Sequence, residues 1–210
     1  MKGIFITLEG NEGCGKSTQI KLLTAYLKNK GCKVLATREP GGTPLGDAIR
    51  EALLNPRFDS MTPLTETLLY MASRSQLVQD VILPALKKKQ VVLCDRWLDA
   101  TVAYQGYAGD VDPALIHSLG KRATQHLRPQ LSLYLDLPVA VGLKRAKRAF
   151  GPDRVEKKAL AYHEKVRQGF LLIARKDPLR FRRLAIRPEE SAAHVHERIK
   201  VEVDRVLHRR

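Results

Sequence analysis

Residues 10–17, Gly-Asn-Glu-Gly-Cys-Gly-Lys-Ser, constrain this chain more than any other feature. A glycine is followed by four variable residues and then by Gly15, Lys16 and Ser17, which is the spacing of a phosphate-binding loop. Glycines let the backbone curl so that its N–H groups face phosphate oxygens, and a following helix adds the positive end of its dipole. The lysine reaches the β- and γ-phosphates, and the Ser17 hydroxyl binds Mg²⁺. We expect ATP to contact Gly10, Asn11, Glu12, Gly13, Cys14, Gly15, Lys16, Ser17 and Thr18.

The residues on either side fit a strand, loop and helix. Residues 2–9 are rich in branched apolar side chains, with Ile4, Ile6 and Leu8 at every second position, as in a buried strand. Residues 19–29 place apolar side chains at helical spacing. The alternative is a glycine turn that joins a strand to a helix without binding phosphate.

Length and composition indicate one cytosolic domain. The 210 residues suffice for a single α/β core, so we expect one domain over residues 1–210. The start of the chain lacks a secretory signal pattern, and no apolar run approaches the length of a membrane span. We therefore expect a cytoplasmic protein without a membrane partner.

The net charge is +15, and it is uneven along the chain. Residues 1–137 carry 17 basic and 13 acidic side chains, whereas residues 138–210 carry 20 and 9. A basic third could steer nucleotides, bind nucleic acid, or be a solvated surface. Few aromatic residues accompany these charges, so nucleic acid is not expected as a partner.

Strand and helix patterns alternate along the whole chain. This order predicts a three-layer α/β/α fold of the phosphate-loop NTPase type, with a five-stranded parallel sheet. We predict strands at residues 2–9, 32–39, 90–95, 130–137 and 180–188, and helices at 19–29, 45–54, 64–86, 138–149, 156–175 and 189–207. A further helical region is expected between the third strand and about residue 125. An exposed loop is expected at 150–155.

Polar residues follow the predicted strands. Because parallel strands present their carboxyl ends at one edge, we expect four of these ends to meet in one cleft, bringing together Glu9, Arg38, Glu39, Asp95, Arg96 and Asp136. Asp95 fits an acid that holds Mg²⁺ or its waters, although an acid after a strand is also a common turn or helix cap. Arg96 beside it could bind a second phosphate.

Tyr70 and Arg74 lie four residues apart on the helix predicted at 64–86. This spacing places both on one face, where the ring could stack on a base while the guanidinium donates to its carbonyl. The alternative is a core tyrosine beside a surface arginine. Arg38, Glu39 and Arg50 are further candidates for the acceptor side of the site.

Several segments together resemble the bacterial thymidylate kinases. They are ITLEGNEGCGKST, TREPGGTPLGDAIR, DRWLDATVAYQG, LYLDL and DRVE followed by YHEKVRQGF, in the order and spacing of that family. TREPGGT and the DR…AYQG pattern are the segments most specific to that family, since a phosphate loop alone occurs in many others. The resemblance implies transfer of the γ-phosphate of ATP to dTMP, giving dTDP and ADP, by a Mg²⁺-dependent cytosolic homodimer.

The same resemblance implies roles for individual residues. It implies that dTMP contacts Arg38, Glu39, Arg50, Tyr70, Arg74, Arg96, Thr101, Tyr104 and Gln105. Within this set Arg74 meets the thymine carbonyl, and Tyr104 lies against the sugar and leaves no room for a 2′-hydroxyl. Tyr70 stands where the family usually has phenylalanine. Trp97 and Ala100 also depart from the commoner residues.

A basic segment at residues 144–156 resembles a lid. The phosphate loop has no arginine, so the missing positive charge should come from Arg145, Arg148 or Arg154. The predicted catalytic residues are Lys16, Glu12, Asp95, Arg96, Arg148 and Arg154, with Ser17 and Asp95 at the metal. Another monophosphate kinase, a deoxynucleoside kinase and a nucleic-acid-dependent ATPase are the alternative functions.

Overall fold

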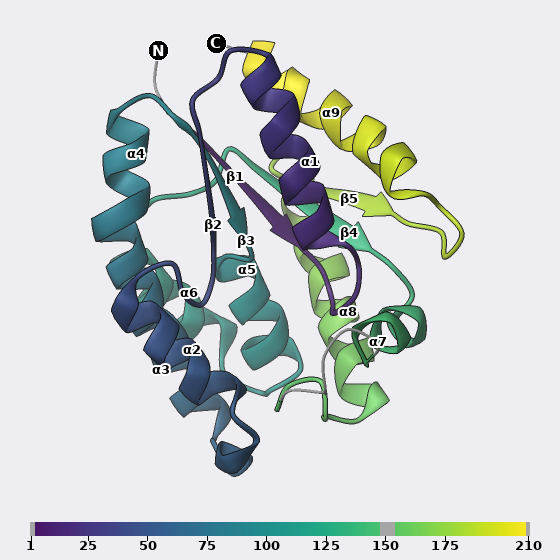
Figure 1. The fold of residues 1–210 in the computed structure, drawn as a ribbon. Helices are drawn as coiled ribbons and strands as arrows, with labels where there is room; N and C mark the ends of the chain where they lie inside the picture. Colours follow the sequence, from purple (N-terminus) through teal and green to yellow (C-terminus); the bar gives the residue numbers. More distant parts are fainter. Residues whose placement is uncertain (1–2, 148–153, 209–210) are drawn as a thin grey trace.

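The computed structural model describes residues 3–147 and 154–208 (Figure 1). Within these ranges the strands are β1 (Ile4–Glu9), β2 (Val34–Arg38), β3 (Val91–Asp95), β4 (Leu131–Asp136) and β5 (Phe181–Ala185). They form one parallel sheet in the order β2-β3-β1-β4-β5. The predicted five-stranded parallel sheet is therefore confirmed.

Helices cover both faces of this sheet. They are α1 (Lys16–Asn29), α2 (Pro44–Leu54), α3 (Pro63–Leu77), α4 (Leu83–Lys87), α5 (Leu98–Thr101), α6 (Pro113–Ala123), α7 (Val139–Lys147), α8 (Leu160–Lys176) and α9 (Ala192–His208). Short turns of other helix types lie at η1 (Pro56–Phe58), η2 (Val78–Ile82) and η3 (Val102–Tyr107).

Side-chain alternation along β1 explains the three layers. Ile4, Ile6 and Leu8 point into a core formed with α1 and α9, whereas Phe5 points into a second core with η2, α4 and Trp97. A strand that is covered on both faces has no solvent side, and every residue of β1 is buried.

The helix predicted at residues 64–86 is one helical stretch with a change of pitch. A π-helical turn at Val78–Ile82 separates α3 from α4 and ends two residues before Pro84. Proline has no N–H for the regular ladder, so a local change of pitch fits this place.

The segment after residue 153 differs from the sequence prediction. Arg154 and Val155 are buried, although an exposed loop was expected, and the helix begins at Leu160 and not at residue 156. The N–H of Arg154 donates to the carbonyl of Leu54 over 3.1 Å, and Val155 packs in a core cluster. These contacts hold the chain in turns before α8 starts.

No helix in residues 3–147 and 154–208 combines the length and the apolar character that a membrane span requires.

Candidate functional site

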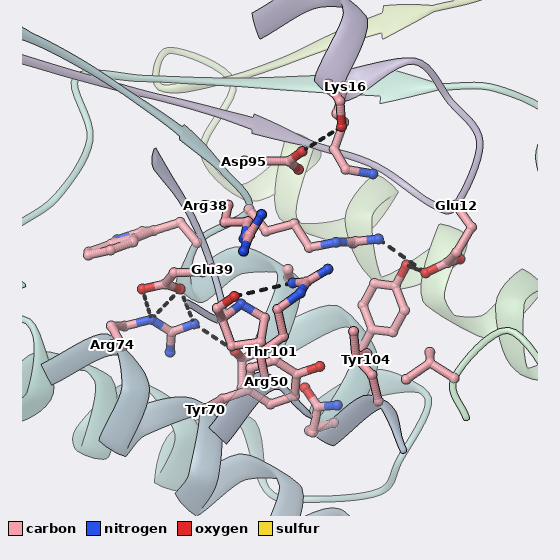
Figure 2. A pocket seen from close by; sticks show the side chains of 18 of the residues that line it. Glu12, Lys16, Arg38, Glu39, Arg50, Tyr70, Arg74, Asp95, Thr101 and Tyr104 are labelled. Atoms are coloured by element: carbon pink, nitrogen blue, oxygen red, sulfur yellow. Dashed lines mark hydrogen bonds and ion pairs between the residues drawn. The ribbon is translucent and has the colours of Figure 1, made fainter. Parts of the chain in front are cut away.

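A cavity of about 360 Å³ lies where β1, β2 and β3 end (Figure 2). Residues that follow these strands line it together with residues of α2, α3, α5 and η3. Asp136, at the end of β4, does not line this cavity, because it pairs with Arg167 and Arg183 over 2.7 Å each. The expectation that four strand ends meet in one cleft is therefore wrong for β4. At β1 the following loop lines the cavity with Glu12 and Gly13, whereas Glu9 itself is fully buried and does not line it. The residues expected after β2 and β3 all line it: Arg38, Glu39, Asp95 and Arg96.

The phosphate loop has the backbone that its glycines predict. Gly10, Gly13 and Gly15 have φ of 143°, 66° and 97°, a region that side chains with a Cβ rarely adopt. The ammonium of Lys16 donates to the carbonyls of Gly10 at 3.1 Å and Asn11 at 3.0 Å. The Lys16 ammonium is therefore hydrogen-bonded to the loop itself, and the oxygens of a bound phosphate would accept these hydrogen bonds in place of the two carbonyls.

Ser17 and Asp95 lie together beside this loop. The hydroxyl of Ser17 donates to Oδ2 of Asp95 over 3.2 Å, although the two residues are 78 positions apart. A hydroxyl and a carboxylate next to a phosphate site form an oxygen donor set that suits Mg²⁺. The predicted metal residues are thus brought together.

Arg74 and Glu39 form a buried ion pair at the opposite end of the cavity. Nη2 of Arg74 lies 2.7 Å from Glu39, and Nε donates to both oxygens of the same carboxylate at 2.8 and 3.0 Å. Nη2 also donates to the hydroxyl of Thr101 over 2.9 Å. Only 1% of Arg74 is exposed, so its guanidinium is fixed in one orientation.

The alternative of a core tyrosine beside a surface arginine is wrong. Arg74 is buried, whereas Tyr70 is half-buried and lines the cavity with its ring. Burial raises the pKa of the Tyr70 hydroxyl to about 12, so this side chain stays neutral at physiological pH.

Glu12 connects the phosphate loop to the middle of the cavity. One of its oxygens accepts hydrogen bonds from Tyr104 at 2.6 Å and Arg96 at 3.1 Å. Its other oxygen lies 3.2 Å from Nδ1 of His163. Burial disfavours ionisation of Glu12, but His163, Arg96 and Lys16 outweigh it and hold the pKa of this carboxyl well below its usual range.

Arg38 and Arg50 lie on the same side of the cavity as Glu39. Arg50 donates to the carbonyl of Pro40 over 3.2 Å, and Arg38 lies 3.2 Å from Asp47. Burial and the neighbouring Arg38 lower the pKa of the Arg50 guanidinium. An anionic group between these two cations would relieve their repulsion, as expected for an acceptor phosphate.

The arginines of the 144–156 segment have different surroundings. Arg154 is buried and donates to the carbonyl of Leu53 at 2.8 Å and to Glu66 at 2.6 Å. Arg145 donates to the carbonyl of Pro188 over 2.7 Å. Arg148 lies outside the described residues. In this structure neither Arg145 nor Arg154 lines the cavity.

Sequence reasoning missed Glu66 and His163. Glu66 is four residues before Tyr70, so the spacing that linked Tyr70 to Arg74 places it on the same helix face. Gln105, a predicted base-reading residue, donates to Glu66 over 2.8 Å. No local pattern identifies His163, because its partner Glu12 is far away in the sequence.

The fold and this cavity define an enzyme of the phosphate-loop type. Comparison with known proteins agrees. The thymidylate kinase family model matches residues 8–199. A thymidylate kinase of Geotalea uraniireducens is 51% identical over 185 residues, which cover 85% of this chain and 87% of the relative.

Two further thymidylate kinases are similar to this chain over most of its length. A thymidylate kinase of Deinococcus radiodurans is 49% identical over 190 residues, which cover 90% of this chain and 92% of that protein. The solved structure of thymidylate kinase from Ehrlichia chaffeensis matches with a TM-score of 0.75 at 32% identity, covering 96% of this chain and 99% of that one. This chain belongs to the thymidylate kinase family.

Proposed function

We propose that this chain transfers the γ-phosphate of ATP to dTMP, giving dTDP and ADP for dTTP synthesis. The observation that carries the assignment is one continuous cavity, with Lys16 and Ser17 of the phosphate loop at one end and Arg74 with Gln105 at the other. Two phosphorylated molecules placed end to end in such a cavity would present their phosphates to one another, and this alignment supplies much of the rate.

The acceptor nucleotide lies in the half of the cavity away from the phosphate loop. Its base stacks on Tyr70 and meets Arg74, Thr101 and Gln105, whose polar groups line that end. Tyr104 lies against the sugar, and Arg38, Arg50 and Arg96 surround the phosphate, with Glu39 holding Arg74.

Positive charge at the transferred phosphate comes from Lys16, Arg96 and the 144–156 segment. Charge spreads over the oxygens of the transferred group, so fixed cations stabilise the transition state. Glu12 orients Arg96 and Tyr104 for this step. Arg154 must leave Glu66 before it can reach a phosphate.

Mg²⁺ is the metal that the oxygen donors of Ser17 and Asp95 fit. When bound with ATP, it neutralises charge on the β- and γ-phosphates. The protein's part is to present the Ser17 hydroxyl and the Asp95 carboxylate beside the loop.

The working form is a cytoplasmic homodimer. Along α3 the exposed residues Leu64, Leu68 and Ala72 form an apolar stripe at helical spacing, with the two leucines 46% and 50% exposed. An apolar stripe of this kind is a suitable surface for a second copy. Sedimentation of the wild-type protein and of L68E tests this: the variant should be a monomer at concentrations where the wild-type protein is a dimer.

A coupled assay of ADP release tests the reaction. It should be run with the monophosphates of thymidine, deoxyuridine, uridine and guanosine, and dTMP should give the highest kcat/KM. Stimulation of ATP hydrolysis by polynucleotide, without transfer to any monophosphate, would instead support the nucleic-acid-dependent alternative that the +15 charge raises.

A further inference from the structure

We propose that Glu66 is a positioning residue for base selection, because it turns the Gln105 amide so that the amide oxygen faces the base. The fixed oxygen then favours a pyrimidine that carries a hydrogen on N3, as thymine does, over cytosine. This inference rests on the proposed function, in which the base lies beside Gln105.

The contact between the two side chains is short and buried. Nε2 of Gln105 donates to Oε2 of Glu66 over 2.8 Å, and the two residues are 2% and 1% exposed. Water therefore competes little for either group, and the bond holds the amide in one orientation.

The charge of Glu66 decides which way the amide must face. The other oxygen of Glu66 lies 2.6 Å from Nη1 of Arg154 and 3.4 Å from Nζ of Lys158. Glu66 is thus ion-paired with both side chains, and a carboxylate accepts hydrogen bonds and cannot donate. The reverse orientation of Gln105 would bring its oxygen against a buried carboxylate oxygen, with no hydrogen between them.

The planar geometry of the amide then sets the direction in which the Gln105 oxygen points. Oxygen and nitrogen of the amide diverge from the same carbon, so a nitrogen that faces Glu66 leaves the oxygen facing away from it. Gln105 lines the cavity together with Arg74. That end of the cavity therefore presents an acceptor from Gln105 beside the guanidinium of Arg74, which only donates.

This pattern matches thymine at two adjacent positions and opposes cytosine at both. Thymine has a donor at N3 and an acceptor at C4, whereas cytosine has an acceptor at N3 and a donor at C4. When buried groups of a site pair with groups of the substrate, an analogue that leaves them unpaired has a kcat/KM lower by large factors. Without Glu66 the Gln105 amide could turn over and pair with the N3 of cytosine.

The test is E66Q, because a neutral amide at this position both donates and accepts and so permits either orientation of Gln105. The ratio of kcat/KM for dTMP to that for dCMP should fall at least about tenfold, mainly through KM, while kcat for dTMP changes less than KM does. E51Q is the matched control, because Glu51 is exposed on α2 and does not line the cavity. E51Q should leave the ratio of kcat/KM for dTMP to that for dCMP within about twofold of the wild-type value.

The double variant E66Q/Q105E keeps the proposal testable if E66Q does not fold. Its new amide at position 66 can accept from Arg154 and donate to the new carboxylate at position 105. That carboxylate again presents an oxygen to the base, so the preference for dTMP should return. A folded double variant that uses dCMP as well as dTMP would overturn the proposal.

Q105L separates this inference from the proposed function. If Q105L leaves KM for dTMP unchanged, the base does not lie beside Gln105, and the proposed acceptor site fails. If Q105L raises KM while E66Q keeps the ratio within about twofold, the site stands and the positioning role of Glu66 is overturned.

Discussion

The hydroxyl of Tyr104 donates a 2.6 Å hydrogen bond to Glu12, and so joins the wall of the acceptor site to the phosphate loop. Y104F keeps the ring and removes this bond. Because a hydrogen bond to a charged group contributes about 1.5 to 3 kcal/mol, kcat/KM for dTMP should fall roughly 10- to 100-fold. The preference for deoxyribose over ribose should persist, since the ring still fills the same space.

Tyr26 offers the matched control for that substitution. Its hydroxyl donates to Asp204 over 2.7 Å, in a pair of similar geometry outside the cavity. Y26F should leave kcat/KM within about twofold. Equal losses in both variants, measured by the coupled assay, would show that the Tyr104 bond has no special part in transfer.

Arg96 should be required for transfer and not for folding. Its guanidinium lies 3.1 Å from Glu12 and 4.9 Å from the centre of the Tyr104 ring, and the residue lines the cavity. R96A should lower kcat/KM by about 10³, which is typical of removing a fixed positive group from a transition state. R57A, which removes an exposed arginine, is the control. Near-normal turnover by folded R96A, with an unchanged melting temperature, would refute the assignment.

The sheet and one edge of the site could be predicted because their signals are local. The strands are segments of five or six residues of which at least three are apolar, and parallel strands present the residues that follow them at one edge. That is why Asp95 and Arg96 could be placed beside the phosphate loop. Asp136 met the same criterion and yet lies apart, because Arg167 and Arg183 pair with it.

The partners of the buried charges could not be predicted from the sequence. Arg74 was expected at the base, but its pairing with Glu39 joins residues 35 positions apart. Arg154 was expected in an exposed lid, and Glu66, 88 positions earlier, binds it in a buried site. Such pairs depend on how α2, α3 and the chain before α8 pack together, which no spacing within one segment encodes.

Glu39 should make dTMP binding depend on pH. Burial raises the pKa of this carboxyl from 4.5 to about 6, despite the opposing effect of Arg74. As the pH falls through about 6, Glu39 takes up a proton and loses its ionic hold on Arg74, so KM for dTMP should rise. The effect on stability has the opposite sign: a raised pKa contributes to the free energy of unfolding below pH 4.5, and this contribution is lost as the pH rises through 6.

E39Q is the control for the pH effect. The phosphate of the acceptor also titrates near pH 6, but it does so in both proteins. The ratio of KM in E39Q to KM in the wild-type protein should therefore approach one as the pH falls from about 7 to 5. A ratio that stays constant over this range would contradict the prediction.

Gly142 lets α7 pack directly against the phosphate loop. A Cβ at this position would overlap the carbonyl oxygen of Glu12, and a Cβ at Gly13 would overlap the carbonyl oxygen of Gly142. G142A should displace the loop by a fraction of an ångström, which is enough to lower kcat about tenfold. A140S changes an exposed residue of the same helix and should leave kcat unchanged. A fully active G142A would mean that the loop tolerates the shift.

Arg154 and Glu66 should be coupled in stability, because each neutralises the other in a buried site. In R154A the buried carboxylate of Glu66 keeps only the more distant and more exposed Lys158 as a cationic partner, so the free energy of unfolding should fall by about 3 kcal/mol. The neutral side chain in R154A/E66Q removes that charge, and the double variant should recover at least about 1 kcal/mol of the loss. Urea denaturation of the wild-type protein, both single variants and the double variant measures the coupling.

R128A is the control, because it breaks the exposed pair with Asp177, and it should lower the free energy of unfolding by less than about 1 kcal/mol. Additive losses in the double variant would show that the two side chains do not depend on each other.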